Sequence, residues 1–183
     1  SRVNEIKRML PVMLAAAEEL QNKYSEIQFV LPQADSITDE LLQSYLQASV
    51  ANVTVIKNQP YDVIQCCDAI MTTSGTASLE IAILQIPMVI AYRLSAITYF
   101  FAKYLVNTKF IGLPNIIAGK GIVKELIQHD VTANKLADEI DQILQDQSYR
   151  ENILAELAVV KERLGKGGGS KNMADLAIKM LSV

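Results

Sequence analysis

The sequence lacks the residue types that several common kinds of site require. It contains no tryptophan and only 6% aromatic residues, so a stacking platform for nucleic-acid bases is not expected. Its formal net charge is −3 at pH 7, which argues against an electrostatic nucleic-acid interface. The single histidine, His129, and the adjacent Cys66 and Cys67 offer too few ligands for a zinc site. We therefore expect no nucleic acid, no metal and no cofactor.

The cysteines and the apolar segments indicate the cellular environment. Cys66 and Cys67 are neighbours in the sequence, and because neighbouring cysteines rarely bridge each other, a disulfide framework is excluded and a reducing cytosol is indicated. The segment 81–92 comes nearest to a membrane-spanning run, but Gln85 and Pro87 interrupt it. It is also shorter than the roughly 20 residues that a transmembrane helix needs.

Short apolar stretches alternate with segments of helical spacing through the first half of the chain. Predicted strands lie at 27–31, 52–56, 69–71 and 87–92, and predicted helices at 3–22, 38–46, 60–67 and 77–84. Apolar strands joined by helices are typical of a parallel sheet that is covered on both faces. The predicted fold class is α/β, a Rossmann-like parallel sheet flanked by helices, with ligands at the carboxyl ends of the strands. The first strand is expected to stop at Pro32.

The second half of the chain carries further predicted elements. We expect an irregular loop at 113–119, a helix at 123–128, a helix capped by Thr132, and a helix that starts with a capping box at Ser148 and ends near Leu164. The glycine-rich stretch that follows predicts a flexible hinge. This divides the chain into a Rossmann-like domain, residues 1–164, and a hinge with a C-terminal helix, residues 165–183.

The apolar segment 96–106 allows two interpretations. Its Ile97, Phe100, Phe101 and Tyr104 share one helical face, with Lys103 beside them. This face is either part of the core or a contact with lipid headgroups, in which case the lysine favours anionic lipid.

The clearest ligand-binding pattern runs from Met71 to Glu80. An apolar strand gives way to a helix through Ser74, Gly75 and Thr76, and such a junction aims unpaired backbone N–H groups and the positive end of the helix dipole at one point. That point suits a phosphate or diphosphate. Glu80, about one turn further on, can accept hydrogen bonds from the two hydroxyls of a sugar. The same residues also fit an ordinary helix cap.

Four separated motifs together resemble one known family, the lipid-A-disaccharide synthases, and the resemblance covers essentially the whole chain. The motifs are Ser1-Arg2 with Glu5 and Leu10-Pro11; Ser74-Gly75-Thr76-Ala77-Ser78-Leu79-Glu80; Pro87-Met88-Val89 with Tyr92-Arg93; and Leu113-Pro114-Asn115-Ile116-Ile117-Ala118-Gly119 with Val123-Lys124-Glu125-Leu126-Ile127-Gln128.

This resemblance implies a glycosyltransferase of the GT-B fold, in which two Rossmann-like halves enclose a metal-independent active site. The implied reaction moves 2,3-diacylglucosamine from its UDP conjugate to 2,3-diacylglucosamine 1-phosphate, forming the lipid A disaccharide 1-phosphate and UDP. The C-terminal half of such enzymes holds the nucleotide. The implied location is the cytoplasm, peripheral at the cytoplasmic face of the inner membrane, where the surface could touch lipid.

The resemblance also implies roles for individual residues. Arg2 would stabilise the charge on the departing diphosphate, while the base is not in this chain. The other expected substrate contacts are Ser1, Ser74, Gly75 and Thr76 for the phosphates, Glu80 for the ribose, Asn115 for the sugar or diphosphate, and Gln128 as a further polar contact.

The chain lacks several parts that the family pattern places before Ser1. The glycine and strand that precede Ser1 in the family are missing, as are the acceptor domain and its catalytic acid. We therefore expect this chain alone to bind nucleotide weakly and to be inactive. Met173, Leu176 and Met180 of the last helix would lack a partner, and the hinge would let them pack on a second copy in a dimer formed by helix exchange.

Two alternatives stay open at this point. The first is another UDP-sugar enzyme, such as a UDP-N-acetylglucosamine 2-epimerase or the transferase that forms lipid II. The second is a non-catalytic nucleotide-binding subunit of a split enzyme.

Overall fold

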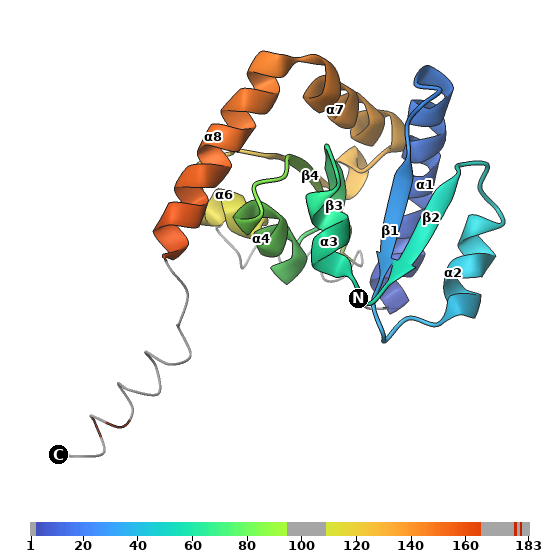
Figure 1. Ribbon diagram of the computed structural model, residues 1–183, viewed down its shortest axis with the longest axis horizontal. Coiled ribbons are helices and arrows are strands. Elements are labelled where there is room, and N and C mark those ends of the chain that lie inside the picture. The colour runs from blue at the N-terminus through green and yellow to red at the C-terminus, as the bar shows by residue number, and fades with distance from the viewer. Residues whose placement is uncertain (1–2, 95–108, 166–177, 179, 181–183) are drawn as a thin grey trace.

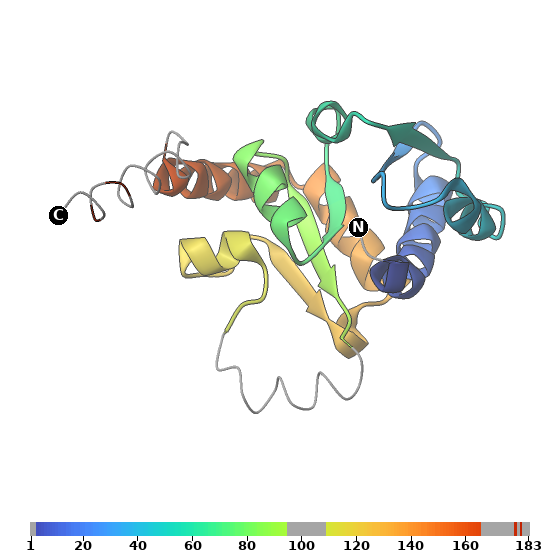
Figure 2. The ribbon, with the colours of Figure 1, turned by 90° about the horizontal axis from the view of Figure 1, so that it is seen from below.

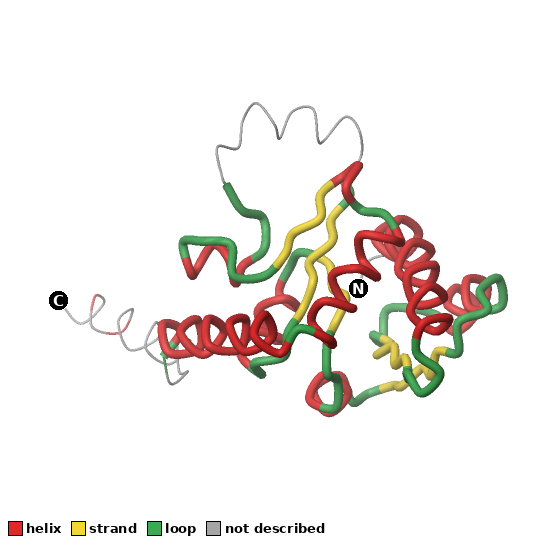
Figure 3. The backbone as a smooth tube through the Cα atoms, turned by 90° about the horizontal axis from the view of Figure 1, so that it is seen from above, coloured by secondary structure: helices red, strands yellow, loops and turns green. Residues whose placement is uncertain are grey.

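The computed structural model describes residues 3–94, 109–165, 178 and 180. In these ranges the strands form two parallel sheets, which Figure 3 shows as two groups of yellow segments. The two-stranded sheet pairs β1 (Phe29–Gln33) with β2 (Val53–Lys57). The three-stranded sheet has the order β3 (Ile70–Thr73), β4 (Met88–Tyr92) and β5 (Lys124–Ile127). The predicted α/β class with parallel strands is confirmed.

Helices connect the strands and cover them (Figure 1). They are α1 (Val3–Lys23), α2 (Asp39–Leu46), α3 (Pro60–Gln65), α4 (Thr76–Ile83), α6 (Leu113–Ala118), α7 (Ala133–Gln145) and α8 (Gln147–Leu164), with a short 3-10 turn, η1, at Gln128–Asp130. The predicted cap at Thr132 is confirmed, because its hydroxyl accepts a hydrogen bond from Lys135 N. Thr38 caps α2 in the same way, by accepting from Leu41 N.

The core is centred on β4, which lies between β3 and β5 (Figure 2). Residues 88–91 are completely buried, as expected for a parallel strand with neighbours on both edges and helices on both faces. Buried side chains of α1, α4, α7 and α8 pack against it in one cluster. A second, smaller cluster joins α1 and α2 to the β1–β2 pair.

The long helix α1 is joined to α7 by a polar contact as well as by apolar packing. Lys23 Nζ lies 2.6 Å from a carboxylate oxygen of Asp141, and the Tyr24 hydroxyl donates to the other oxygen. These two hydrogen bonds, that of Lys23 above all, lower the pKa of Asp141 below its ordinary value. The contact fixes one end of α1 against the three-stranded half of the molecule.

Two predicted elements of the second half were wrong in type. The segment 113–119, expected as an irregular loop, forms the short helix α6, with Pro114 in its first turn and Gly119 as a left-handed cap at φ 74°. The segment 123–128, expected as a helix, contains strand β5. Its residues have good helix propensity, but the open edge of β4 pairs with them, and this tertiary contact overrides a weak local preference.

Two finer predictions were also wrong. Pro32 does not stop the first strand but lies within β1, in register with Ile56. A strand tolerates proline there because only one edge of β1 pairs with another described strand. The cap of α8 is Asp146, whose side chain accepts from Tyr149 N, while the Ser148 hydroxyl donates to that same carboxylate.

Several predictions fall outside the described residues. These are the segment 96–106, the glycine run from residue 166 onward, and Met173 and Leu176 of the last helix. The helix predicted to end near Leu164 does end there, and Gly165 adopts φ 75°; the division of the chain into two parts at this point stays a prediction. In the part of the chain that the structure describes, no helix is both long and apolar enough to cross a membrane.

Candidate functional site

The junction of β3 and α4 has the geometry that the sequence predicts. β3 ends at Thr73 and α4 begins at Thr76, with Gly75 as the residue that precedes the helix. No side chain caps this helix end. The N–H of Ser78 donates to Gly75 O at 3.2 Å, whereas the N–H groups of Thr76 and Ala77 precede the first full helical turn and have no acceptor within the helix. Gly75, Thr76 and Ala77 are exposed. The turn can therefore present backbone N–H groups and the positive end of the helix dipole to an anion.

Gly75 gives the turn its shape. Its φ of 151° and ψ of −166° lie in a region that is essentially restricted to glycine. A Cβ at this position would have no atom within 4 Å, so the space above the turn is open. From the helix side, the Ser78 hydroxyl donates to Gly75 O at 2.7 Å, and Ser78 is fully buried. The turn is thus fixed by Ser78 on the side of the helix and is open to solvent on the opposite side.

Glu80 lies one turn into α4 and points towards α3. Its carboxylate accepts a hydrogen bond of 3.2 Å from the hydroxyl of Tyr61, whose side chain is 52% exposed. The negative charge of Glu80 raises the pKa of Tyr61. The remaining lone pairs of this partly exposed carboxylate can accept hydrogen bonds from a ligand. Sequence reasoning missed Tyr61, which only the fold brings to Glu80.

Ser74 contacts a segment that is distant in the sequence. Its hydroxyl donates to the backbone oxygen of Ile111 at 2.7 Å. This bond ties the β3–α4 turn to the chain that leads into α6. In this arrangement the Ser74 proton points to Ile111, so donation to a phosphate would require the hydroxyl to turn.

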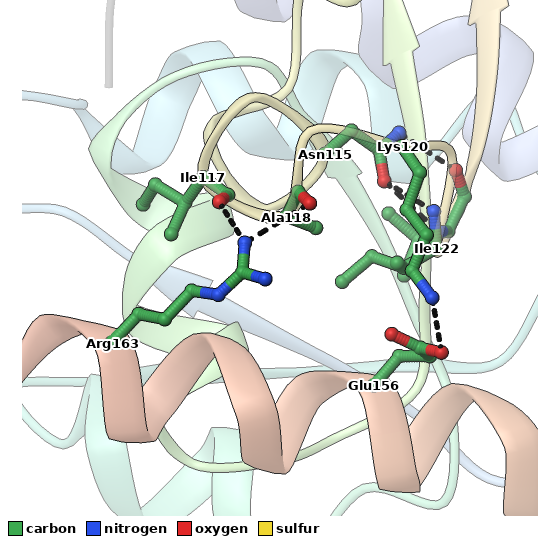
Figure 4. A network of polar contacts seen from close by, with 8 residues as sticks. Asn115, Ile117, Ala118, Lys120, Ile122, Glu156 and Arg163 are labelled. Atoms are coloured by element: carbon green, nitrogen blue, oxygen red, sulfur yellow. Dashed lines mark hydrogen bonds and ion pairs between the residues drawn. The ribbon is translucent and has the colours of Figure 1, made fainter.

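Asn115 is buried, and its amide is occupied by the protein. Its Nδ2 donates to Val123 O at 2.9 Å and to Glu125 Oε1 at 2.6 Å, while its Oδ1 accepts from the N–H groups of Ile122 and Val123. Figure 4 shows this side chain between α6 and the start of β5. A direct contact of Asn115 with a ligand stays a prediction; what the structure shows is a side chain that fastens α6 to β5.

The far end of α6 is fastened to α8. Arg163 donates to Ile117 O and Ala118 O, at 2.8 and 3.0 Å, and so satisfies carbonyls at the end of α6. Lys120 lies 2.6 Å from Glu156 (Figure 4). The helix that follows Ile111 is therefore held at both ends.

Gln128 follows the carboxyl end of β5 and binds Leu94, two residues after the end of β4. Its Oε1 accepts from Leu94 N at 2.6 Å, and its Nε2 donates to Leu94 O at 3.4 Å. In return, the Arg93 guanidinium donates to Gln128 O and to Val131 O. These bonds fix where the chain leaves the sheet after β4.

The predicted site residues thus fall into three groups. Ser74, Gly75, Thr76 and Glu80 lie together at the β3–α4 junction. Asn115 and Gln128 belong to the neighbouring β5 region. Ser1 and Arg2 lie outside the described residues. Among the described side chains, no three His, Cys, Asp or Glu residues are grouped as a metal site would require.

Comparison with known proteins identifies the family. The family model described as lipid-A-disaccharide synthetase matches residues 1–178. This chain belongs to the lipid-A-disaccharide synthetase family.

Proteins named lipid-A-disaccharide synthase align over nearly the whole chain. The one from Geobacter sulfurreducens is 47% identical over 181 residues, 99% of this chain and 47% of its own length. The one from Geobacter metallireducens is 46% identical over the same extent, and the one from Trichlorobacter lovleyi is 40% identical. The chain therefore spans about half the length of these curated relatives of the lipid-A-disaccharide synthetase family.

Proposed function

We propose that this chain is the donor-binding half of a glycosyltransferase. The enzyme would transfer 2,3-diacylglucosamine from UDP-2,3-diacylglucosamine to 2,3-diacylglucosamine 1-phosphate, and form lipid A disaccharide 1-phosphate and UDP. The observation that carries the proposal is the open turn before α4, with Glu80 one helical turn away, in a chain of this family. The names of the relatives support this choice of reaction.

The diphosphate of the donor would rest on the β3–α4 turn. The N–H groups of Gly75, Thr76 and Ala77 would donate to its oxygens, with the Thr76 hydroxyl beside them and Ser74 holding the turn. As the sugar leaves, negative charge grows on the diphosphate, and fixed dipoles and a guanidinium stabilise that charge without a metal ion. We assign the guanidinium to Arg2, with Ser1 as a further phosphate contact.

Glu80 would hold the ribose hydroxyls. An ionised carboxylate is an acceptor only, and the hydrogen bond from Tyr61 fixes its orientation while leaving acceptor sites on the carboxylate for a diol. Asn115, in α6, would contact the sugar or the diphosphate, and Gln128, directly after β5, would be a further polar contact.

Residues outside this chain would supply the acceptor site and the base, because the relatives are about twice as long as the region they share with it. In this proposal residues 1–183 alone are inactive. Because both substrates would carry acyl chains, we place the enzyme at the cytoplasmic face of the inner membrane, in peripheral contact with it.

We also propose that two copies form a dimer by exchanging their C-terminal helices.

The test is a calorimetric titration with UDP. It uses the full-length protein, by which we mean residues 1–183 together with the additional half that the relatives contain. Glu80→Ala should weaken UDP binding by about 1–3 kcal/mol, because the ribose hydroxyls lose their acceptor. Arg2→Ala should weaken it as well. The matched control is Glu162→Ala, which removes an exposed carboxylate near the end of α8 and should leave UDP binding unchanged. Equal affinity of Glu80→Ala and the parent protein would contradict the proposal.

A panel of donors separates this function from its alternatives. Transfer with UDP-2,3-diacylglucosamine, but not with UDP-N-acetylglucosamine, supports the lipid A reaction. Epimerisation of UDP-N-acetylglucosamine, or its transfer to a lipid-linked acceptor, would instead favour one of the other UDP-sugar enzymes.

A further inference from the structure

Glu125, in β5, holds the segment that leads into α6. Its Oε2 accepts from the N–H of Ile111 at 2.9 Å. Its Oε1 accepts from the N–H of Gly112 at 3.0 Å and from the Asn115 amide at 2.6 Å. Hydrogen bonds to an ionised acceptor are stronger than those between neutral groups. A single partly buried carboxylate thus fixes two consecutive backbone N–H groups and the first turn of α6.

The Ile111–Gly112 peptide group links Glu125 to the β3–α4 turn. The N–H of Gly112 and the C=O of Ile111 belong to the same planar peptide unit. Glu125 accepts from its N–H, and Ser74 donates to its C=O at 2.7 Å. The result is a hydrogen-bond chain from the Ser74 hydroxyl through one peptide group to the Glu125 carboxylate. Bonds in such a chain polarise and strengthen one another.

The packing around Gly112 leaves this peptide group little freedom. A Cβ at Gly112 would collide with Ile90 Cδ1, in β4, and would come within 3.0 Å of Glu125 Oε1. The backbone at residue 112 therefore lies directly against the side chains of Ile90 and Glu125, and a side chain at this position would displace them. The hydrogen-bond chain ends on Glu125 in β5, and β5 pairs with β4, whose residues 88–91 are completely buried.

We propose that Glu125 is a positioning residue of the donor site, which through the Ile111–Gly112 peptide orients Ser74 and with it the phosphate-binding N–H groups of residues 75–77. The inference rests on the proposed function, because it takes the β3–α4 turn as the diphosphate site. Glu125 itself touches no substrate in this scheme. It acts by keeping the turn in the geometry in which its N–H groups converge.

The test is a double-mutant cycle on the full-length protein, with UDP affinity measured by calorimetry below the melting temperature of every variant. Glu125→Ala should weaken UDP binding about tenfold, and Ser74→Ala about fivefold, the fold-changes that the loss of one or two hydrogen bonds produces. Either change breaks the same hydrogen-bond chain. The double variant should therefore bind UDP about tenfold more weakly than the parent, whereas independent effects would multiply to a loss of about fiftyfold.

Conservative replacement separates positioning from a general loss of stability. In Glu125→Gln the amide oxygen can still accept from Gly112 and Asn115, while the NH₂ group takes the place of the oxygen that accepts from Ile111 N–H, so that bond and the charge are lost. We expect this variant to recover most of the affinity and to bind UDP only about two- to threefold more weakly than the parent. It also keeps the proposal testable if Glu125→Ala does not fold. Glu162→Gln, which changes an exposed carboxylate on α8, is the matched control.

Each outcome decides the inference. Weaker UDP binding that is coupled to Ser74 and largely restored by glutamine supports it. If Glu125→Ala has a lower melting temperature but unchanged UDP affinity, Glu125 serves only the fold, and the inference is overturned. The proposed function would still stand in that case, provided that Glu80→Ala weakens UDP binding. Multiplying effects of Glu125→Ala and Ser74→Ala would overturn it too. If the parent protein does not bind UDP, the proposed function fails and the inference fails with it.

Discussion

At the scale of single residues, the site depends on the backbone at Gly75. Its φ of 151° and ψ of −166° are strained for any residue with a side chain, although the space around a Cβ is open. A substitution here therefore acts through the backbone and changes the direction of the neighbouring N–H groups.

Gly75→Ala should weaken UDP binding at least about tenfold, because the strain of about 1–3 kcal/mol is relieved by moving the phosphate-binding N–H groups. Calorimetric titration of the full-length protein measures this. The control is Gly165→Ala, which also places alanine at a positive φ with no atom within 4 Å, but at the end of α8. If both variants bind UDP equally well, the turn does not carry the phosphates.

The sequence was enough to predict the β3–α4 turn and to place Glu80 one turn into the helix that follows it. Both features depend on a local change from strand to helix. It did not suffice for Tyr61 or Glu125. Tyr61, in α3, reaches Glu80, in α4, only because the fold brings these two residues together. Glu125 was placed on a predicted helix, and its contact with Ile111 exists only because that segment is a strand.

At the scale of elements, α8 supports the α4 and α6 region with an apolar face. Leu157 is completely buried in the main core cluster. Leu157→Ala should lower the free energy of unfolding by about 2–5 kcal/mol, since it removes buried methyl groups and leaves a cavity. Urea unfolding of the full-length protein measures this. Leu164→Ala makes the same change at a site that is 39% exposed on the same helix, and should cost much less; equal losses would contradict the packing described here.

The contact between α1 and α7 predicts a dependence of stability on pH. The pKa of Asp141 is lowered in the folded protein from an ordinary value of 3.8, first by Lys23 and then by Tyr24. A group whose pKa is lower in the folded state stabilises the fold above its unfolded pKa, and this contribution is lost as the pH falls through the folded value. We expect stability to decrease below about pH 4.

Asp141→Asn should therefore lower stability at neutral pH by about 1 kcal/mol, the typical worth of a partly exposed hydrogen-bonded pair. Its stability should also change less than that of the parent between about pH 5 and pH 3. Urea unfolding across this range is the measurement. Asp138→Asn, which removes an exposed carboxylate of the same helix, is the control. An unchanged pH dependence in Asp141→Asn would disprove the assignment.

Elements with strong periodicity or buried strands were predicted from sequence more reliably than short mixed segments. Helix α1 and strand β4 were placed within one or two residues. The segments that became α6 and β5 are short, and their residues suit more than one structure. What decided them was the edge of β4 and the burial of Asn115, neither of which a local pattern contains.

At the scale of the whole molecule, residues 1–183 correspond to about half the length of the relatives. If the other half supplies the acceptor site and the base, a polypeptide of residues 1–183 should show no transfer of 2,3-diacylglucosamine from its UDP conjugate. The full-length protein should show it under the same conditions. A transfer assay with both polypeptides decides this, and measurable transfer by residues 1–183 alone would refute the division of roles.

The central claim is that the diphosphate of a nucleotide binds at the turn before α4 and that Glu80 binds its ribose. The most direct test is a crystal structure of the full-length protein with UDP. We predict diphosphate oxygens within hydrogen-bond distance of the N–H groups of residues 75–77, and ribose hydroxyls on the carboxylate of Glu80. UDP bound away from this turn, or a Glu80 carboxylate that accepts no hydrogen bond from the ribose, would contradict the account.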